Sequence, residues 1–422
     1  MIEIEELRAA GLHIDRFRLR AGEAWCCLGG TGSGMERFSA VLGGTETSCT
    51  ARRLELPRDI GVISFRGQQE LYEAELRRDD TDFLDRLDPG TPARAFLTRA
   101  EEHRALIDLF RLGPHLDKGY RQLSSGQARK LLLLAQLTRG ASLLVIENPW
   151  EGLDQAACAE LDRVLAGLPD RCLGLLLFVG NQADIPAWCT HLAAFRDGRL
   201  VVQGDAATVH SEVRAALKRP EGLFRVSVEE LRAERRTADN GADTLISLRG
   251  GFARYGEVEL FNGLDLEIRR NDHTLITGPN GCGKSTLLQN LTGDHPLCYA
   301  NDLTVFGRRR GSGESIWDLK RHMGIVSGDL HRNHRVAGSA LAVVISGLYD
   351  SIGLYTRPTA GDEALARRWL GRVGLDHRAG TSFRGLGYGE QRLLLLARAL
   401  IKAPRLMVLD EHDMVVQANS MA

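Results

Sequence analysis

The segment from Gly278 to Thr286 reads Gly-Pro-Asn-Gly-Cys-Gly-Lys-Ser-Thr and fits the phosphate-loop pattern G-x-x-x-x-G-K-[ST]. Its small residues let successive backbone N–H groups turn toward phosphate oxygens, while Lys284 adds a cation and Ser285 a hydroxyl for Mg²⁺. An ordinary Gly-rich turn before a helix is the alternative, and the complete match disfavours it. The residues predicted to hold a nucleoside triphosphate are Gly278, Pro279, Asn280, Gly281, Cys282, Gly283, Lys284, Ser285 and Thr286.

Such a loop must be positioned by a strand before it and a helix after it. The apolar run 273–277 is expected to be that strand. Farther along, residues 386–390 read Leu-Gly-Tyr-Gly-Glu and open a helical apolar stretch at 393–401. An apolar strand is expected at 405–411, where it ends in two carboxylates. This order of loop, five-residue motif, helix and acidic strand describes one α/β unit.

The first half of the chain repeats this order. Gly29-Gly-Thr-Gly-Ser-Gly34 follows the apolar residues 25–28, Leu123-Ser-Ser-Gly-Gln127 opens a helix at 128–138, and a strand is expected at 143–148. In both halves the leucine of the five-residue motif lies 24 positions before the acid of the strand, Leu123 before Glu147 and Leu386 before Asp410. The shared order and spacing indicate a tandem duplication.

Length and composition agree with two domains. A chain of 422 residues exceeds the usual size of one domain. A net charge of -1 with 26% charged residues gives no indication of nucleic-acid binding. The eight cysteines lack zinc-ligand spacing and are typical of reduced cytosolic thiols. No apolar stretch reaches the ~20 residues that a membrane-spanning helix needs, so any membrane role would require a partner.

This set of motifs resembles the ATP-binding cassette family, whose signature sequence LSGGQ is close to Leu123-Ser124-Ser125-Gly126-Gln127. The resemblance covers nearly the whole chain. Within the family, the segment 62–69, the Asp-Asp-Thr-Asp-Phe-Leu84 stretch and Asn181 are similar to tandem cassette ATPases associated with molybdate transport. The resemblance implies an α/β fold with two tandem P-loop NTPase domains, the second truncated after the Walker B strand. The expected boundaries are a degenerate domain at 1–210, a charged linker at 211–244 and an incomplete domain at 245–422.

In this family each ATP lies between the phosphate loop of one domain and the signature motif of the other. The resemblance therefore implies that Ser285 and Asp410 orient Mg²⁺, with Lys284 at the phosphates and Glu411 as general base for the attacking water. Tyr255 is a candidate for stacking on adenine, and an aromatic side chain that simply packs in the core is an equal alternative.

The first half departs from this pattern at the matching positions. Met35 replaces the lysine, Glu36 the Mg²⁺ hydroxyl, Glu147 the aspartate, Asn148 the general base, and Asn181 the switch histidine. Losing a charge-assisted contact costs about 1.5–3 kcal/mol, and losing a general base costs ~10²–10⁴ in rate. A pocket built on this half is expected to bind ATP poorly.

The signature motifs depart in the opposite half. Ser124, Ser125, Gly126 and Gln127 keep a hydroxyl at a helix N-terminus, whereas the motif at 386–390 lacks the serine and carries an acid. Pairing across the halves therefore leaves one coherent site, which the Gly152-Leu153-Asp154 loop is expected to reach. Random decay is the alternative, but decay has no reason to spare every part of one site.

Two further departures predict slow turnover. After Glu411 the sequence lacks the Gly-Leu-Asp loop and the switch position of the first half, and His412 is an unsuitable substitute. Gln68 or Gln69 is a candidate for the loop glutamine that senses Mg²⁺ and contacts a transport channel. The second half has no glutamine at this place, although Asp329 is a candidate for reaching Mg²⁺ through water.

These observations predict an ATP-binding protein with one competent composite site that uses ATP and Mg²⁺. The resemblance implies a cytoplasmic place, with peripheral attachment to an integral membrane permease, plausibly for molybdate. The alternatives are a soluble regulatory or stress/repair-type cassette ATPase without a channel partner, and a scaffold that binds nucleotide without turnover.

Overall fold

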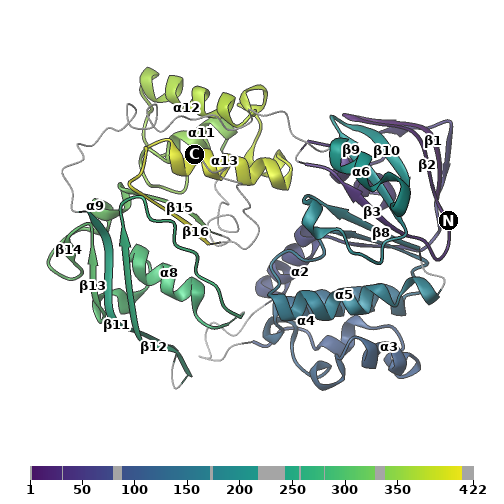
Figure 1. Ribbon diagram of the computed structural model, residues 1–422, viewed down its shortest axis with the longest axis horizontal. Coiled ribbons are helices and arrows are strands. Elements are labelled where there is room, and N and C mark those ends of the chain that lie inside the picture. Colours follow the sequence, from purple (N-terminus) through teal and green to yellow (C-terminus); the bar gives the residue numbers. More distant parts are fainter. Residues whose placement is uncertain are drawn as a thin grey trace. The chain divides into compact units, whose positions relative to one another are not determined.

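The computed structural model describes residues 2–30, 32–78, 88–171, 174–216, 243–255, 258–279, 281–327 and 338–410. The chain forms two compact units, Met1–Lys218 and Arg219–Ala422, and each is described by itself (Figure 1). Helix α6 (Ala206–Ala216) belongs to the first unit and extends into the segment 211–244 that the sequence suggests as a linker.

The first unit is built on a 10-stranded sheet with the order β4-β1-β2-β10-β9-β3-β8-β7-β6, and β5 pairs with β1. Its strands are β1 Ile2–Ala9, β2 Leu12–Leu19, β3 Ala24–Leu28, β4 Cys49–Thr50, β5 Arg53–Glu55, β6 Ile60–Ile63, β7 Leu143–Glu147, β8 Gly174–Val179, β9 His191–Arg196 and β10 Arg199–Asp205. Its α-helices, besides α6, are α1 Met35–Leu42, α2 Phe65–Arg77, α3 Arg104–Leu109, α4 Ser125–Thr138 and α5 Gln155–Ala166.

The centre of this sheet is parallel and buried on both faces. Strand β3 pairs in parallel with β8 and β9, and β7 pairs in parallel with β8 and β6. Successive side chains of a strand point to opposite faces, so Cys26 and Leu28 join one hydrophobic core and Trp25 and Cys27 join another. Figure 1 shows α4 and α5 side by side in this unit. The strands predicted at 25–28 and 143–148 are confirmed.

The second unit has two smaller sheets. Strands β12, β11, β13 and β14 form an antiparallel sheet in that order, and β15 and β16 form a separate parallel pair. The strands are β11 Thr244–Tyr255, β12 Val258–Arg269, β13 Asp302–Val305, β14 Arg308–Arg309, β15 Met323–Ser327 and β16 Leu406–Asp410. The α-helices are α8 Lys284–Thr292, α9 Ile316–Lys320, α11 Ala340–Ser346, α12 Ala360–Arg372 and α13 Tyr388–Leu400.

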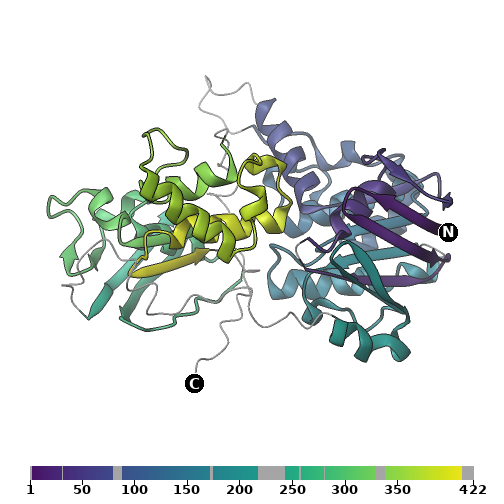
Figure 2. The same cartoon turned by 90° about the horizontal axis from the view of Figure 1, so that it is seen from above.

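Two cores stabilise the second unit. One joins α8 and α9 to β11 and β13, and the other joins α11, α12 and α13, whose green-to-yellow ribbons pack together in Figure 2. The strand pair β15–β16 contributes to both, since Met323 lies in the first core and Val326 in the second. The helix predicted at 393–401 and the acidic strand predicted at 405–411 are confirmed as α13 and β16 within the described residues.

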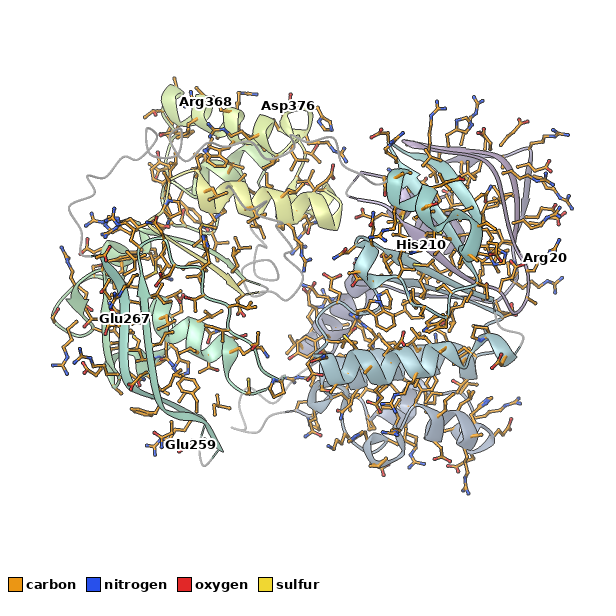
Figure 3. All side chains as sticks on the ribbon, in the orientation of Figure 1. Arg20, His210, Glu259, Glu267, Arg368 and Asp376 are labelled. Atoms are coloured by element: carbon orange, nitrogen blue, oxygen red, sulfur yellow. The ribbon has the colours of Figure 1, made fainter. Side chains whose placement is uncertain are left out.

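The β11–β12 hairpin presents a polar face to solvent. Along β12, exposed and partly buried residues alternate, as expected for a strand with one solvated face. Figure 3 shows Glu259 beside the turn of this hairpin and Glu267 farther along it. The Arg269 guanidinium, which donates to Glu267 at 2.9 Å, holds the pKa of that carboxyl below its usual value.

One predicted strand is wrong. Residues 272–279 form no strand, and Leu275 in the predicted run 273–277 is 85% exposed. In the first unit the equivalent strand β3 obtains its backbone hydrogen bonds from β8 and β9. Among the described residues 243–410 of the second unit, no segment lies in the place of β8 or β9. A strand without a neighbour leaves its backbone groups to water, so the apolar run stays irregular and exposed.

Candidate nucleotide-binding site

The phosphate loop of the second unit has a backbone that only glycine adopts without strain. Gly281 (φ 81°) and Gly283 (φ 94°) are both in the left-handed region, and Gly283 caps the start of α8. A Cβ atom built on Gly283 would lie 3.0 Å from Cβ of Leu260 on β12. This loop therefore presents the unpaired N–H groups at the start of α8, where the helix dipole favours an anion.

The side chains of this loop suit a magnesium–phosphate group. Ser285 Oγ donates a hydrogen bond to Asp410 Oδ1 at 3.1 Å, so α8 and β16 bring together two residues that are distant in sequence. Hard oxygen donors are what Mg²⁺ prefers, and a hydroxyl beside a carboxylate provides two of them. Lys284 Nζ donates to the carbonyls of Gly278 (2.7 Å) and Pro279 (2.8 Å), which holds its charge over the loop. These residues fit the predicted ligand.

The other residues predicted to bind nucleotide differ in their burial, and some of them lie outside the described part of the chain. Cys282 is half-buried and its backbone N–H donates to Pro279 at 3.4 Å, which closes the turn of the loop. Thr286 is buried, so its side chain packs within the unit. Several predicted residues lie outside the described part of the chain: Asn280, Asp329, Glu411, His412 and the side chain of Tyr255.

The first unit retains the same loop backbone. Gly32 (φ 77°) and Gly34 (φ 92°) match Gly281 and Gly283, and α1 begins at Met35 as α8 begins at Lys284. Met35 therefore occupies the position of the lysine, and Glu36 that of the Mg²⁺ hydroxyl. The first unit keeps the shape of an anion cradle and lacks its cation.

The intact signature motif of the first unit opens α4. Ser124 Oγ accepts from Gln127 N at 3.2 Å, and Ser124 N donates to Gln127 Oε1 at 3.1 Å, a reciprocal capping box. In the second unit Gly387 takes the capping position of α13, and its N–H donates to Glu390 Oε2 at 2.8 Å. The second motif therefore presents no capping hydroxyl, and its carboxylate is held in a hydrogen bond.

A cavity of about 250 Å³ lies beside this motif in the first unit. Ser124, Gln127, His115, Lys130 and Glu160 are among its lining residues. Lys130 pairs with Glu160 at 3.1 Å, and His115 Nε2 lies 3.1 Å from Gln127 Nε2. Burial, followed by the charges of Lys118 and Lys130, lowers the pKa of His115 below its usual value.

The other candidate residues of the first unit, Gln68, Gln69 and Asn181, form hydrogen bonds within that unit. Gln68, on α2, donates through Nε2 to the carbonyl of Ser125 at 3.3 Å and accepts from Arg129 Nε at 3.2 Å. Gln69 instead donates to Glu73 at 3.4 Å. Asn181 caps a short 3₁₀ turn by accepting from Ala183 N at 3.1 Å. Gln68 is thus the glutamine that reaches the signature motif.

Arg129 was missed by sequence reasoning. It lies on α4, two positions after the last residue of the signature motif, and is 2% exposed. Its Nη1 donates to the carbonyls of Asn148 (3.2 Å) and Pro149 (2.8 Å). The available signal was the pair of charges Arg129-Lys130 before the apolar run 131–134, where the helix must be buried.

ATP-binding cassette proteins are characterised by a phosphate loop, a Mg²⁺-binding carboxylate and a signature motif. In this chain the second unit has the loop at the start of α8 and the Ser285–Asp410 pair, and the first unit has the capped motif on α4. The chain belongs to the ATP-binding cassette (ABC) ATPase family. Residues 261–413 match the family described as ABC transporter. The chain is 35% identical to the ABC transporter ATP-binding protein ModF of Escherichia coli K12 over 412 residues, which are 95% of this chain and 84% of that protein.

More distant relatives cover similar lengths. An uncharacterized ABC transporter ATP-binding protein of Schizosaccharomyces pombe is 24% identical over 94% of this chain and 84% of its own length. Two solved structures share the fold. One, a model of ribosome-bound archaeal Pelota and ABCE1, has a TM-score of 0.59 and 17% identity over 97% of this chain and 68% of that chain. The other, an archaeal ribosome recycling factor with a ribosomal stalk protein, has a TM-score of 0.53 and 16% identity over 94% and 76%.

Within the described residues, every helix is too short or too polar to cross a bilayer.

Proposed function

We propose that this chain binds one Mg-ATP, in the phosphate loop of the second unit. The observation that carries the proposal is the Ser285–Asp410 hydrogen bond at the start of α8, beside the Lys284 ammonium. Ser285 and Asp410 would hold the Mg²⁺ of the bound Mg-ATP. Lys284 would offset the negative charge of the phosphates. The first unit offers a similar backbone with Met35 and Glu36 in place of these groups, so its own loop binds ATP weakly.

The bound nucleotide is covered by the signature motif of the first unit. Support comes from the difference between the two motifs, since Ser124 provides a hydroxyl at a capped helix start and Gly387 provides none. In this proposed arrangement the motif residues Ser124, Ser125, Gly126 and Gln127 approach the terminal phosphate. Glu411 follows Asp410 directly and is the general base that accepts a proton from the attacking water.

Turnover is proposed to be slow. A phosphate loop stabilises developing charge only when it is held rigidly before reaction. Here the loop is entered by the exposed run 273–277, and a paired strand such as β3 would hold it more firmly.

The similarity to ModF favours an association with a transport system, plausibly for molybdate, in which a membrane permease is the partner and substrate specificity belongs to other subunits. One observation favours the alternative of an ATPase without a channel. Gln68, at the position expected to face a channel, is hydrogen-bonded to Ser125 and Arg129 within its own unit. Co-purification with an integral membrane protein from solubilised membranes supports the permease, and its absence under mild detergents supports the alternative.

The nucleotide site is tested by titrating the full chain with Mg-ATP in a calorimeter. Lys284→Ala should weaken binding by about 10- to 100-fold, because a hydrogen-bonded charge contributes roughly 1.5–3 kcal/mol. Ser124→Ala should also weaken binding, whereas Gly387→Ser should change it little. Wild-type affinity in Lys284→Ala would reject the assigned loop, and a larger effect at Gly387 than at Ser124 would reject pairing across the units.

A further inference from the structure

A network of hydrogen bonds within the first unit ties the start of α4, where the signature motif lies, to helix α2 and to the loop after β7. Arg129 Nε donates to Gln68 Oε1 at 3.2 Å, and Gln68 Nε2 donates to the carbonyl of Ser125 at 3.3 Å. Arg129 Nη1 also reaches the carbonyls of Asn148 and Pro149, directly after β7. We name these five residues the Arg129 network.

A second link joins the same parts. Ser125 Oγ donates to the carbonyl of Gly152 at 3.1 Å, so α4 contacts the loop after β7 at two places. Ser125 and Arg129 are four residues apart and therefore lie on one face of the helix. Asn148 has a φ of 45°, a conformation that non-glycine residues seldom adopt, and the guanidinium bond to its carbonyl helps to hold it there. The start of α4 is fixed on two sides.

From this geometry we propose that Arg129 is a positioning residue for ATP. It holds Ser124 and Gln127 in a binding-ready orientation, so the first unit needs no nucleotide in its own loop. This inference rests on the proposed function, in which that motif covers the ATP of the second unit. It also gives Gln68 a role, since its side-chain amide accepts from Arg129 and donates to the carbonyl of Ser125.

The chemistry of the side chain explains why arginine is required. A guanidinium presents several N–H donors in a fixed plane and can bond an amide oxygen and two carbonyls at once, whereas lysine offers a single point charge. Burying a charge at 2% exposure is unfavourable, and a well-packed apolar side chain often gives equal stability. A buried arginine that links α4 to α2 and to the loop after β7 is therefore better explained by orientation than by stability.

The test measures Mg-ATP affinity of the full chain in four forms: wild type, Arg129→Gln, Ser124→Ala and the double variant. Arg129→Gln should weaken binding about tenfold. In the Ser124→Ala background the same change should have little further effect, because Arg129 acts through the motif. Arg139→Gln, at the exposed end of the same helix, is the matched control and should leave affinity unchanged.

The outcomes separate the two proposals. Wild-type affinity in Ser124→Ala would reject the composite site itself. A weakened Ser124→Ala with an unaffected Arg129→Gln would overturn only the role of Arg129. An equal tenfold loss in both backgrounds would show a general structural effect and would also overturn it. If Arg129→Gln does not fold, Gln68→Ala takes its place, with a loss of about threefold that should likewise vanish in the Ser124→Ala background.

Discussion

At the residue scale, a phosphate loop needs both a particular backbone shape and a particular set of side chains. Both units have the backbone shape, and the second unit also has the lysine and the serine. Gly32 and Gly34 keep the left-handed geometry of Gly281 and Gly283. Such geometry depends on the absence of a Cβ atom and persists when neighbouring side chains change. Phosphate affinity depends on the cation and the hydroxyl, which only the second unit has. A glycine pattern alone is therefore weak evidence for binding.

His115 provides a prediction about pH at the same scale. Its pKa in the folded protein is below the usual 6.5 because burial and the charges of Lys118 and Lys130 disfavour the protonated ring. The unfolded chain then binds a proton more readily, so this contribution to stability is complete above pH 6.5 and is lost as pH falls. We expect the free energy of unfolding to decrease as pH falls below about 6.5.

Urea denaturation at several pH values measures this effect. His115→Gln removes the titrating group, so its stability should depend less steeply on pH than that of the wild type. His103→Gln changes another histidine of the same unit, which does not line the cavity beside the signature motif, and serves as the control. Equal slopes for His115→Gln and the wild type would contradict the prediction.

At the element scale, the segment before the phosphate loop is a buried strand in the first unit and an irregular, exposed run in the second. Leu28 ends β3 and is fully buried, while Leu275 lies in the irregular run of the second unit and is 85% exposed. Leu28→Ala should destabilise the protein by about 2–5 kcal/mol because it leaves a cavity in the core. Leu275→Ala should change stability by less than about 0.5 kcal/mol. Thermal unfolding compares the two, and a large loss at Leu275 would show that this run is packed.

The same pair shows what sequence can and cannot predict. Strands β3, β7 and β16 were located because a uniformly apolar run flanked by motif residues is typical of a buried parallel strand. The run 273–277, His-Thr-Leu-Ile-Thr, was predicted to be a strand mainly because it precedes the phosphate loop. A strand also needs neighbouring strands, and the run itself does not show whether they are present. The proximity of Ser285 and Asp410 agrees with the Mg²⁺ role that the resemblance to the family implied. The role of Arg129 did not, because its partners are backbone carbonyls with no residue-specific signal.

At the scale of the whole molecule, the two units carry different parts of the motif set. Lys284, Ser285 and Asp410 are together in one unit, and Ser124 caps the signature helix of the other. Under the proposed role of the Arg129 network, a motif held by protein contacts does not depend on nucleotide in its own unit. Met35 and Glu36 in the first loop are compatible with that proposal.

This asymmetry predicts the binding stoichiometry. Equilibrium dialysis with labelled ATP should give about one nucleotide per chain, and Lys284→Ala should remove nearly all of it. Adding Met35→Lys to Lys284→Ala should not restore binding, because Glu36 still repels the phosphates and replaces the Mg²⁺ hydroxyl. Met35→Leu in the same background is the control for a change of side chain without charge. Substantial binding regained by the lysine alone would mean that the first loop needs only its cation, and that the two units differ far less than their side chains indicate.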